Sequence, residues 1–423
     1  MDLKSQLEAL GMRKGADHIT RASSGSRKRG ADIEELVAGE LIENAGGSCY
    51  VARMEHAYAW QHGAASLAQF LALKPDTLAH LARDDSLSQM DPRRAVFVDT
   101  ETTGLAGGTG TYAFMIGIGY FQDEQFVVEQ FFMRDYGEEP AQLLALAERL
   151  KQFETVVSFN GKAFDLPLIQ TRFALSRIPF TLTQGPHLDL LFPSRRLWRD
   201  MLPSCALSTL ETDVLGVQRS GDDVPGYLIP ALYFDYLRNG DARPMVGVFY
   251  HNVQDILSMV TLSVQLCRVF DNPLDAGVAP AEKLGVARIY EDAGRIDESA
   301  QIYQAALQGP LERGREWAAL RRLSLMFKRA GRRSEAADIW RIMLDDEGNA
   351  DIFPFVELAK HHEWYATDLQ EAAAITTRAL EQVSRRHAYW QREQAAEELA
   401  HRLKRLQRKL AGESADSDET RED

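Results

Sequence analysis

The sequence predicts a mixed α/β domain followed by an all-α region of helical repeats. Two observations carry this prediction. Between residues 91 and 271, short β-branched and aromatic runs alternate with amphipathic segments, which is the pattern of an α/β sheet domain. Between residues 280 and 411 the pattern is helical throughout and repeats after about 37 residues. A chain of 423 residues is long enough for two or three domains.

Residues 1–90 show the weakest pattern. We expect a partly flexible region there and assign no fold to it. The stretch SSGSRKRGAD at residues 23–32 is typical of a solvated segment, and residues 64–83 predict a helix with breaks. Basic residues concentrate at 13–29. Such a cluster can follow a phosphate backbone, although a solvated face explains it equally well.

Three strands are expected next, at residues 95–102, 112–121 and 125–133. A glycine-rich turn at 104–111 joins the first two, and the polar residues 122–124 close a hairpin between the second and the third. The three strands therefore predict an antiparallel meander. Four helices and one strand are expected to follow: helices at 138–153, 163–175, 205–216 and 247–270, and a strand at 155–161.

The C-terminal region repeats small and aromatic residues at a fixed spacing. Three positions recur about 37 residues apart: Gly294 with Gly331, Ala300 with Ala337, and Tyr303 with Trp340. A looser third copy follows at 357–380. Small residues let paired helices approach closely and the aromatic rings fill the space between them, so the pattern resembles tetratricopeptide repeats. A plain helical bundle is the alternative.

The net charge of −14 argues at first against a polyanionic partner, but it is unevenly distributed. About −7 falls in residues 95–270 and about −5 in residues 412–423, a tail that we expect to be disordered. No stretch approaches the roughly 20 apolar residues of a membrane span, and the N-terminus lacks the pattern of a secretory signal. Cys49, Cys205 and Cys267 are too few and too widely spaced for a disulfide framework or a zinc site, which predicts a cytoplasmic location.

Asp99 and Glu101 are the first candidate site residues. They are two positions apart on a predicted strand, so both carboxylates point to the same face. Like charges at that distance repel each other unless a cation neutralises them. Two exposed acids that cap the following glycine-rich turn are the alternative explanation.

Two further acids stand in telling surroundings. Asp165 follows a strand and a turn that contains Asn160. The alternative to a site role is that Asp165 is simply an acid in the first turn of a helix, which the helix dipole favours. His251 and Asp255 are four residues apart on a predicted helix and share one face, where a surface His–Asp pair is the alternative. Asp189, in PHLDLL, is read either as support for the site or as a structural acid.

Together these ordered motifs resemble the DEDD exonuclease superfamily, which has the ribonuclease H-like fold. The motifs are Asp-x-Glu on the first strand, FNGKAFDLP around Asp165, and an aromatic or histidine residue four or five positions before a last aspartate. The stretch from DTETTGLAGGTGT through SCALSTLE to HNVQDILSM is similar to the YprB-like ribonuclease H-like family. The resemblance covers roughly residues 90–270.

The resemblance implies a two-metal-ion phosphodiesterase. It assigns the metal ligands, for two Mg²⁺ or Mn²⁺ ions, to four carboxylates: Asp99, Glu101, Asp165 and Asp255. Hard oxygen ligands suit those ions better than zinc. For the general base we predict His251, with Tyr250 as the fallback, because the two residue types stand in exchanged positions relative to the familiar patterns.

Contacts to a substrate strand are expected from the two loops beside the carboxylates. The candidates are Thr100, Thr103, Gly104, Leu105, Asn160 and Lys162. Basic residues at Arg195, Arg196, Arg199 and in 313–333 could follow a phosphate backbone or simply be solvated.

The expected function is a 3′–5′ exonuclease acting on single-stranded nucleic-acid ends, with the repeats free to bind a protein partner and no contact with a membrane. The alternative is a scaffold in which the nuclease fold binds nucleic acid without cutting it and the repeats recruit a partner.

Overall fold

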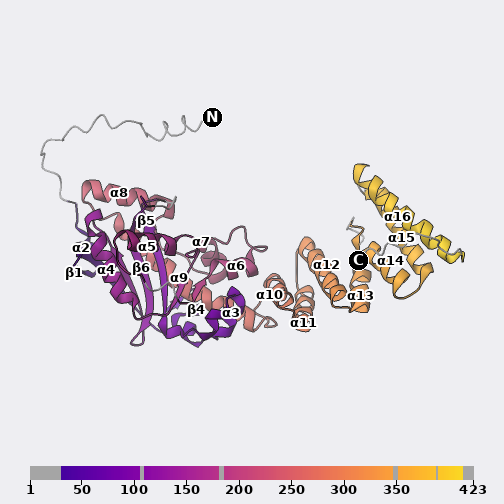
Figure 1. The fold of residues 1–423 in the computed structure, drawn as a ribbon, viewed down its shortest axis with the longest axis horizontal. Coiled ribbons are helices and arrows are strands. Elements are labelled where there is room, and N and C mark those ends of the chain that lie inside the picture. Colours follow the sequence, from indigo (N-terminus) through magenta and orange to yellow (C-terminus); the bar gives the residue numbers. More distant parts are fainter. Residues whose placement is uncertain (1–29, 105–108, 181–184, 346–350, 387–388, 413–423) are drawn as a thin grey trace.

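The computed structural model describes residues 30–104, 109–180, 185–345, 351–386 and 389–412. The predicted fold class is confirmed, because a mixed seven-stranded sheet with helices on both faces is followed by helices alone (Figure 1). The strands are hydrogen-bonded in the order β1-β2-β7-β6-β5-β8-β9. The basic cluster at 13–29 and nearly all of the acidic tail lie outside the described residues.

The centre of the sheet is the predicted antiparallel meander. Strand β5 (Ala95–Thr102) pairs antiparallel with β6 (Ala113–Gln122), which pairs antiparallel with β7 (Gln125–Phe132). On the other side of β5, β8 (Thr155–Ser158) and then β9 (His187–Asp189) run parallel to it. Strand β5 is therefore a central strand, with a neighbour on each side.

The sheet begins earlier in the chain than the predicted boundary at residue 91. Strands β1 (Gly39–Asn44) and β2 (Gly47–Ala57) form a hairpin, and β2 pairs antiparallel with β7 along its length. Polar residues interrupt the apolar pattern of both strands, which is why their sequence did not stand out. Strand β1 forms the edge of the sheet and β2 lies directly inside it, and polar residues are expected where strands near an edge remain partly in water.

Helices cover both faces of the sheet. On one face, α4 (Glu139–Leu150) and α5 (Asp165–Leu175) pack Leu146 and Ile169 against the apolar side chains of the strands. On the other face, α9 (Met245–Asp271) packs Ile256 against Phe97 and Phe126. By length and composition α9 could cross a membrane, which differs from the expectation above, but 78% of its apolar window is buried inside the protein.

Shorter elements complete the α/β region. The segment predicted as a broken helix at 64–83 contains a two-residue β-strand, a 3-10 helix and then α3 (Pro75–Ala82). The helix predicted at 205–216 is shorter, because α7 (Leu207–Leu210) passes into a π-helical turn, η6 (Glu211–Leu215). The remaining elements are α2 (Ile33–Leu36), β3 (Gln61–His62), β4 (Ala65–Ser66), η1 (Leu67–Ala72), η2 (Asp85–Gln89), η3 (Pro92–Arg94), η4 (Tyr136–Glu138), α6 (Leu191–Trp198), η7 (Gly226–Leu228) and α8 (Ile229–Asn239).

The C-terminal region consists of helices that pack against their sequence neighbours. They are α10 (Pro280–Asp292), α11 (Ile296–Leu307), α12 (Arg313–Arg329), α13 (Arg333–Leu344), α14 (Phe353–Trp364), α15 (Leu369–Arg386) and α16 (Tyr389–Leu410). Gly294 and Gly331 occupy equivalent turns with φ of 73° and 76°, a conformation that favours glycine. Tyr303 and Trp340 are both buried at equivalent points of α11 and α13.

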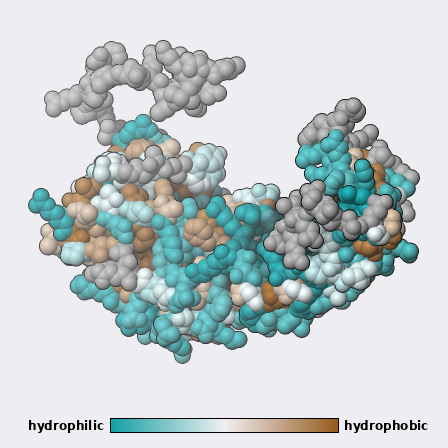
Figure 2. Space-filling view, turned by 45° about the vertical axis from the view of Figure 1, so that its right-hand side comes forward, coloured by the Kyte–Doolittle hydropathy of each residue, from teal (hydrophilic) through white to brown (hydrophobic). Residues whose placement is uncertain are grey.

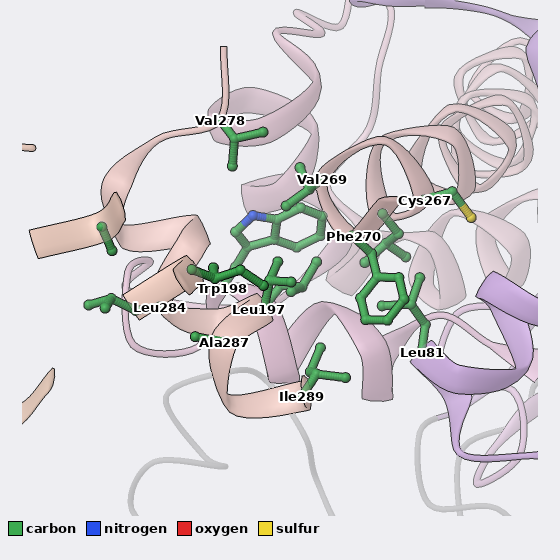
Figure 3. Packing of buried hydrophobic residues seen from close by; sticks show 14 of the residues in the cluster. Leu81, Leu197, Trp198, Cys267, Val269, Phe270, Val278, Leu284, Ala287 and Ile289 are labelled. Carbon is green, nitrogen blue, oxygen red and sulfur yellow. The ribbon is translucent and has the colours of Figure 1, made fainter. Parts of the chain in front are cut away.

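One continuous core joins the two regions. Leu197 and Trp198 of α6 pack with Leu284 and Ala287 of α10 (Figure 3). The Trp198 indole nitrogen donates to Glu282 Oε1 at 3.0 Å. The two regions form the two ends of the molecule, and Figure 2 shows the surface hollowed between them.

Candidate active site

The four predicted carboxylates come from three elements that meet beside the central strand. Asp99 and Glu101 lie on β5, Asp165 is the first residue of α5, and Asp255 lies in the middle of α9. The strand and both helices are held by the packing of the two faces of the sheet. The fold therefore brings together acids that are up to 156 positions apart in sequence.

Glu101 is buried and Asp99 is half-buried, and both lie near like charges. Glu101 is 9% exposed. Burial raises the pKa of Asp99 well above its usual value, and the charges of Asp255 and Asp165 raise it further. Burial, followed by the charge of Asp99, does the same to the pKa of Glu101. These carboxylates are therefore electrostatically strained at neutral pH in the absence of a cation.

Asp165 is buried at the start of α5 and is fixed by the strand beside it. The Thr100 hydroxyl donates to its Oδ1 at 2.5 Å. Burial raises the pKa of Asp165 to about 6 in spite of this hydrogen bond. Thr100 was predicted to contact substrate, but its side chain is buried and committed to Asp165. Its role in this structure is to hold the carboxylate.

A buried amide fixes Asp99. Asn252 of α9 donates from Nδ2 to Asp99 Oδ2 at 2.7 Å, and its own Oδ1 accepts from Gln130 Nε2 at 2.9 Å. Asn252 is fully buried. A Cβ atom at Gly117 would lie 2.0 Å from Asn252 Oδ1, so only glycine at this position of β6 allows the amide to reach Asp99.

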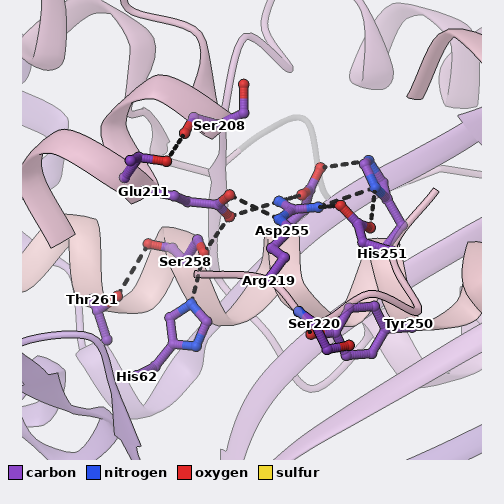
Figure 4. A network of polar contacts seen from close by, with 12 residues as sticks. His62, Ser208, Glu211, Arg219, Ser220, Tyr250, His251, Asp255, Ser258 and Thr261 are labelled. Atoms are coloured by element: carbon purple, nitrogen blue, oxygen red, sulfur yellow. Dashed lines mark hydrogen bonds and ion pairs between the residues drawn. The ribbon is translucent and has the colours of Figure 1, made fainter. Parts of the chain in front are cut away.

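Asp255 is held by an arginine rather than left free. Arg219 donates to Asp255 Oδ1, and it forms a two-pronged ion pair with Glu211 at 2.8 and 2.6 Å (Figure 4). Glu211 is 2% exposed and also accepts from the Ser258 hydroxyl at 2.6 Å. Because Glu211 anchors it, Arg219 is a fixed positive charge at the edge of the carboxylate cluster.

His251 lies beside Asp255, and Tyr250 points elsewhere. His251 Nε2 is 3.7 Å from Asp255 Oδ2, whereas its Nδ1 is 2.8 Å from Asp223 Oδ1. A carboxylate only accepts, so Nδ1 carries the hydrogen and Nε2 keeps the lone pair. The 3.0 Å approach of Arg219 to Nδ1 is then a contact between two donors, not a hydrogen bond. The Tyr250 hydroxyl accepts from the backbone N–H of Ser220 (Figure 4).

The remaining substrate candidates lie in two loops. Thr103 closes the end of β5, because its hydroxyl accepts from the Tyr112 backbone at 3.0 Å. Gly104 has open space around it, and Leu105 lies outside the described residues. Asn160 and Lys162 have exposed side chains next to Asp165.

Asp189 shapes the loop that carries those two residues. Its carboxylate accepts from the backbone N–H groups of Asn160 at 2.8 Å, Lys162 at 3.0 Å and Leu191 at 3.1 Å. It is 2% exposed. Of the two interpretations of Asp189, the structural one therefore describes its contacts. Asn160 has a φ of 63°, so the turn before α5 is tight.

The donor set fits a hard divalent cation in an open rather than a preformed site. Four carboxylates supply oxygen ligands, and a bound cation would relieve their mutual repulsion. Among the residues that the structure describes, however, no three His, Cys, Asp or Glu side chains are arranged as a ready-made metal site. Asp255 is paired with Arg219, which is one reason why its carboxylate is not arranged with the others as a metal site.

Several residues of the two basic clusters within the described residues already have partners inside the protein. Arg196 donates to the backbone carbonyls of His80 and Leu81, and burial lowers its pKa to about 10. Arg199 lies 3.7 Å from Asp200. In the 313–333 segment, three arginines pair with acids of neighbouring helices: Arg322 and Arg329 with Glu291, and Arg332 with Asp297, each at 2.6 Å.

Comparison with known proteins agrees with this arrangement. Residues 96–267 match the sequence model of a family described as the RNase_H superfamily. The domain is ribonuclease H-like. Over 370 residues the chain is also 27% identical to "Uncharacterized protein YprB" from Bacillus subtilis (strain 168), with 86% of each chain covered.

Sequence reasoning missed the residues that hold the carboxylates in place. Asn252 stands next to His251 in HNVQD, so its spacing of three from Asp255 was a usable signal. Arg219, Glu211 and Asp223 gave no such signal. Glu211 begins the π-helical turn η6, Arg219 and Asp223 lie in the irregular stretch after it, and their convergence on α9 is decided by the tertiary fold.

Proposed function

We propose that this protein is a divalent-metal-dependent nuclease of the DEDD type, which removes nucleotides from the 3′ end of a single strand. The coarser statement, a nuclease-like domain with a nucleic-acid substrate, follows from the ribonuclease H-like domain. The finer one is supported by the convergence of Asp99, Glu101, Asp165 and Asp255 from β5, α5 and α9.

The carboxylates would hold Mg²⁺ or Mn²⁺, and both Asp99 and Glu101 feel the charges of Asp165 and Asp255. Two such ions supply a Lewis acid for the phosphodiester and lower the pKa of the attacking water. The protein supplies the position of each oxygen. Asn252 and Gln130 fix Asp99, Thr100 fixes Asp165, and Arg219 fixes Asp255.

His251 would act as the general base. Its Nδ1–H is oriented by Asp223, so Nε2 faces Asp255 with a free lone pair, and it can take a proton from a water held there. Tyr250 is the weaker candidate, since its hydroxyl is bonded to the Ser220 backbone. Asn160 and Lys162 would offer exposed groups to a strand end, and the half-exposed Gly104 would leave room for it.

The helices after residue 280 would serve as a binding module of the tetratricopeptide type. The equivalent turns at Gly294 and Gly331 and the buried Tyr303 and Trp340 support this reading. Repeats of this kind offer extended surfaces to ligands or protein partners.

The decisive experiment is degradation of end-labelled DNA and RNA oligonucleotides with Mg²⁺, Mn²⁺ or EDTA. We expect metal-dependent release of single nucleotides from the 3′ end and loss of that release in Asp99→Ala. Labels at the 5′ and the 3′ end separate the direction of cleavage. Equal degradation by the wild type and Asp99→Ala, or none by either, would contradict the proposal.

A nucleic-acid-binding scaffold is the second candidate. The absence of a ready-made metal site among the described residues and the Arg219–Asp255 ion pair favour it. Calorimetric titration with Mn²⁺ separates the two functions. Binding that disappears in Asp99→Ala supports the nuclease, and oligonucleotide binding without any Mn²⁺ binding supports the scaffold.

A further inference from the structure

A cavity of about 440 Å³ lies among the C-terminal helices and is separate from the carboxylate cluster. Its walls come from α12, α13 and α14 and from the residue that follows α14. We call it the repeat pocket. No residue predicted to act in the nuclease site lines it.

The repeat pocket is cationic. Four basic residues line it, Lys328, Arg329, Arg333 and Lys360, against one acid, Glu357. Both lysines share that acid, at 2.8 and 3.6 Å. The residues that line the pocket therefore carry a net positive charge, although the whole chain has a net charge of −14.

Arg333 is the cation that its surroundings leave free. Arg329 is paired with Glu291 at 2.6 Å, but Arg333 has no carboxylate partner within the part of the chain that the structure describes. Its guanidinium instead lies 3.9 Å from the centre of the Tyr365 ring. It can therefore bind a phosphate without breaking an ion pair.

Aromatic rings form the rest of the wall. Tyr365 is 50% exposed, and Trp364 lies next to it. The Arg333 guanidinium covers one face of the Tyr365 ring, and a tyrosine ring with part of its surface in water is a suitable platform for a nucleobase.

Two ring nitrogens of the lining residues have no hydrogen-bond partner among the residues that the structure describes. They are Nε1 of Trp340, a residue only 2% exposed, and Nδ1 of His361. The indole N–H can only donate, and a buried donor without an acceptor is rare in a folded protein. Within the described part of the chain, Trp340 therefore leaves one donor unsatisfied beside the pocket.

We propose that the repeat pocket binds single-stranded nucleic acid, with a base against Tyr365 and the phosphate backbone along Arg333 and the two lysines. This inference rests on the proposed function, because the strand would be the same one whose end enters the carboxylate site. The shared core at Trp198 and Leu284 fixes the pocket relative to that site (Figure 3). One long strand can then occupy both places, and short strands cannot.

An acidic peptide is the competing occupant for a cationic pocket. It would use the same positive charges but has no flat ring to place on Tyr365. The exposed tyrosine with its stacked guanidinium therefore favours nucleic acid.

The test measures binding by fluorescence anisotropy, with labelled oligothymidylates of 4 to 30 nucleotides and full-length protein carrying Asp99→Ala to prevent cleavage. We expect affinity to rise with length. Tyr365→Ala should weaken binding of the longest strand by about tenfold, and Tyr365→Phe should restore it, because stacking needs the ring and not the hydroxyl. Arg333→Ala should weaken it less and reduce its salt dependence.

The matched control is Arg341→Ala, which removes an exposed arginine of the same helix that is paired with Asp338. Unchanged affinity of both Tyr365→Ala and Arg333→Ala for long strands would overturn the inference. So would displacement of the probe by polyglutamate at equal charge.

Failure of this inference is distinguishable from failure of the proposed function. Hydrolysis of a short chromogenic ester, thymidine 5′-monophosphate p-nitrophenyl ester, by the wild type with Mn²⁺ tests the carboxylate site alone. If the ester is cleaved but long strands ignore Tyr365, only the second site is wrong.

Discussion

Buried acids are treated in opposite ways in the two regions of the molecule. In the C-terminal helices, Glu363 is fully buried and receives hydrogen bonds from Arg402 at 3.1 Å, Arg405 at 2.8 Å and Lys409 at 3.0 Å. Burial alone would raise its pKa, but the hydrogen bonds from Arg405 and Lys409 bring the pKa below its usual value. This acid fastens α16 to α14.

In the α/β region, the buried Glu101 and Asp165 and the half-buried Asp99 have like charges around them, and Arg219 offsets only part of the repulsion at Asp99 and Glu101. Under the proposed function, this difference would separate structural from functional acids. An acid that stabilises the fold is supplied with cations by the fold itself, whereas the acids of the proposed site would take a cation from solution.

The largest effect is expected at the proposed base. His251→Gln should lower the metal-dependent rate by about 10² to 10⁴, because proton transfer from the attacking water is lost. Tyr250→Phe is the matched control and should change the rate by no more than a few-fold. The measurement is initial rates on an end-labelled oligonucleotide at saturating Mn²⁺. A larger loss in Tyr250→Phe than in His251→Gln would reverse the assignment.

Replacing a buried acid by its amide should change the stability of the protein in opposite directions in the two regions. Asp165→Asn should stabilise the metal-free protein at pH 7 by up to about 3 kcal/mol, because the folded state holds its pKa near 6. That gain should vanish below about pH 4, where the carboxyl is protonated folded or unfolded. The stability cost of the native acid therefore appears as the pH rises through 4 to 6.

Glu363→Gln should instead destabilise the protein by about 3 kcal/mol. This is the lower end of the loss expected when a buried ion pair is broken, because the partner cations of Glu363 can reach water. Thermal unfolding in EDTA measures both variants, and hydrogen exchange in α16 localises the second effect. A loss of stability in both variants would remove the distinction between structural and functional acids.

Asp223→Asn should have a smaller effect on catalysis. The amide can present its N–H to Nδ1 and so leave the wrong nitrogen of His251 protonated, which should lower the rate by about 10- to 100-fold. The pH–rate profile should change with it, whereas Mn²⁺ affinity measured by calorimetry should not. Asp222→Asn, the adjacent exposed acid, is the control. A loss of metal affinity in Asp223→Asn would make Asp223 a ligand instead.

The smallest effect concerns His62, which is buried behind the Arg219 network. Burial lowers its pKa to about 4, and its Nε2 is 2.7 Å from the Ser258 hydroxyl. Because the unfolded state takes up a proton near pH 6.5 and the folded state does not, His62 should destabilise the protein by about 2 kcal/mol as the pH falls from 7 to 5. His62→Gln should flatten that decline in chemical denaturation, and exposed His80→Gln should not. Equal slopes in all three proteins would show that His62 is accessible.

Much of the fold could be predicted because the central strands carry continuous apolar runs. The segments around Val98, Ile118 and Val127 have the patterns of buried strands, and all three are core residues. Strands β1 and β2 could not be predicted, since an edge hairpin mixes Glu40 and Arg53 with its apolar residues. Its place beside β7 is a long-range pairing that no local pattern encodes.

The sequence by itself determined which acids could act, because Asp99 and Glu101 share a strand face and His251 and Asp255 share a helix face. Such relations follow from the geometry of one element. Only the tertiary structure decided what holds them. The Asn252 amide against Gly117, the Thr100 hydroxyl on Asp165 and the Arg219–Glu211 pair join separate segments, and contacts between segments exist only once the chain has packed.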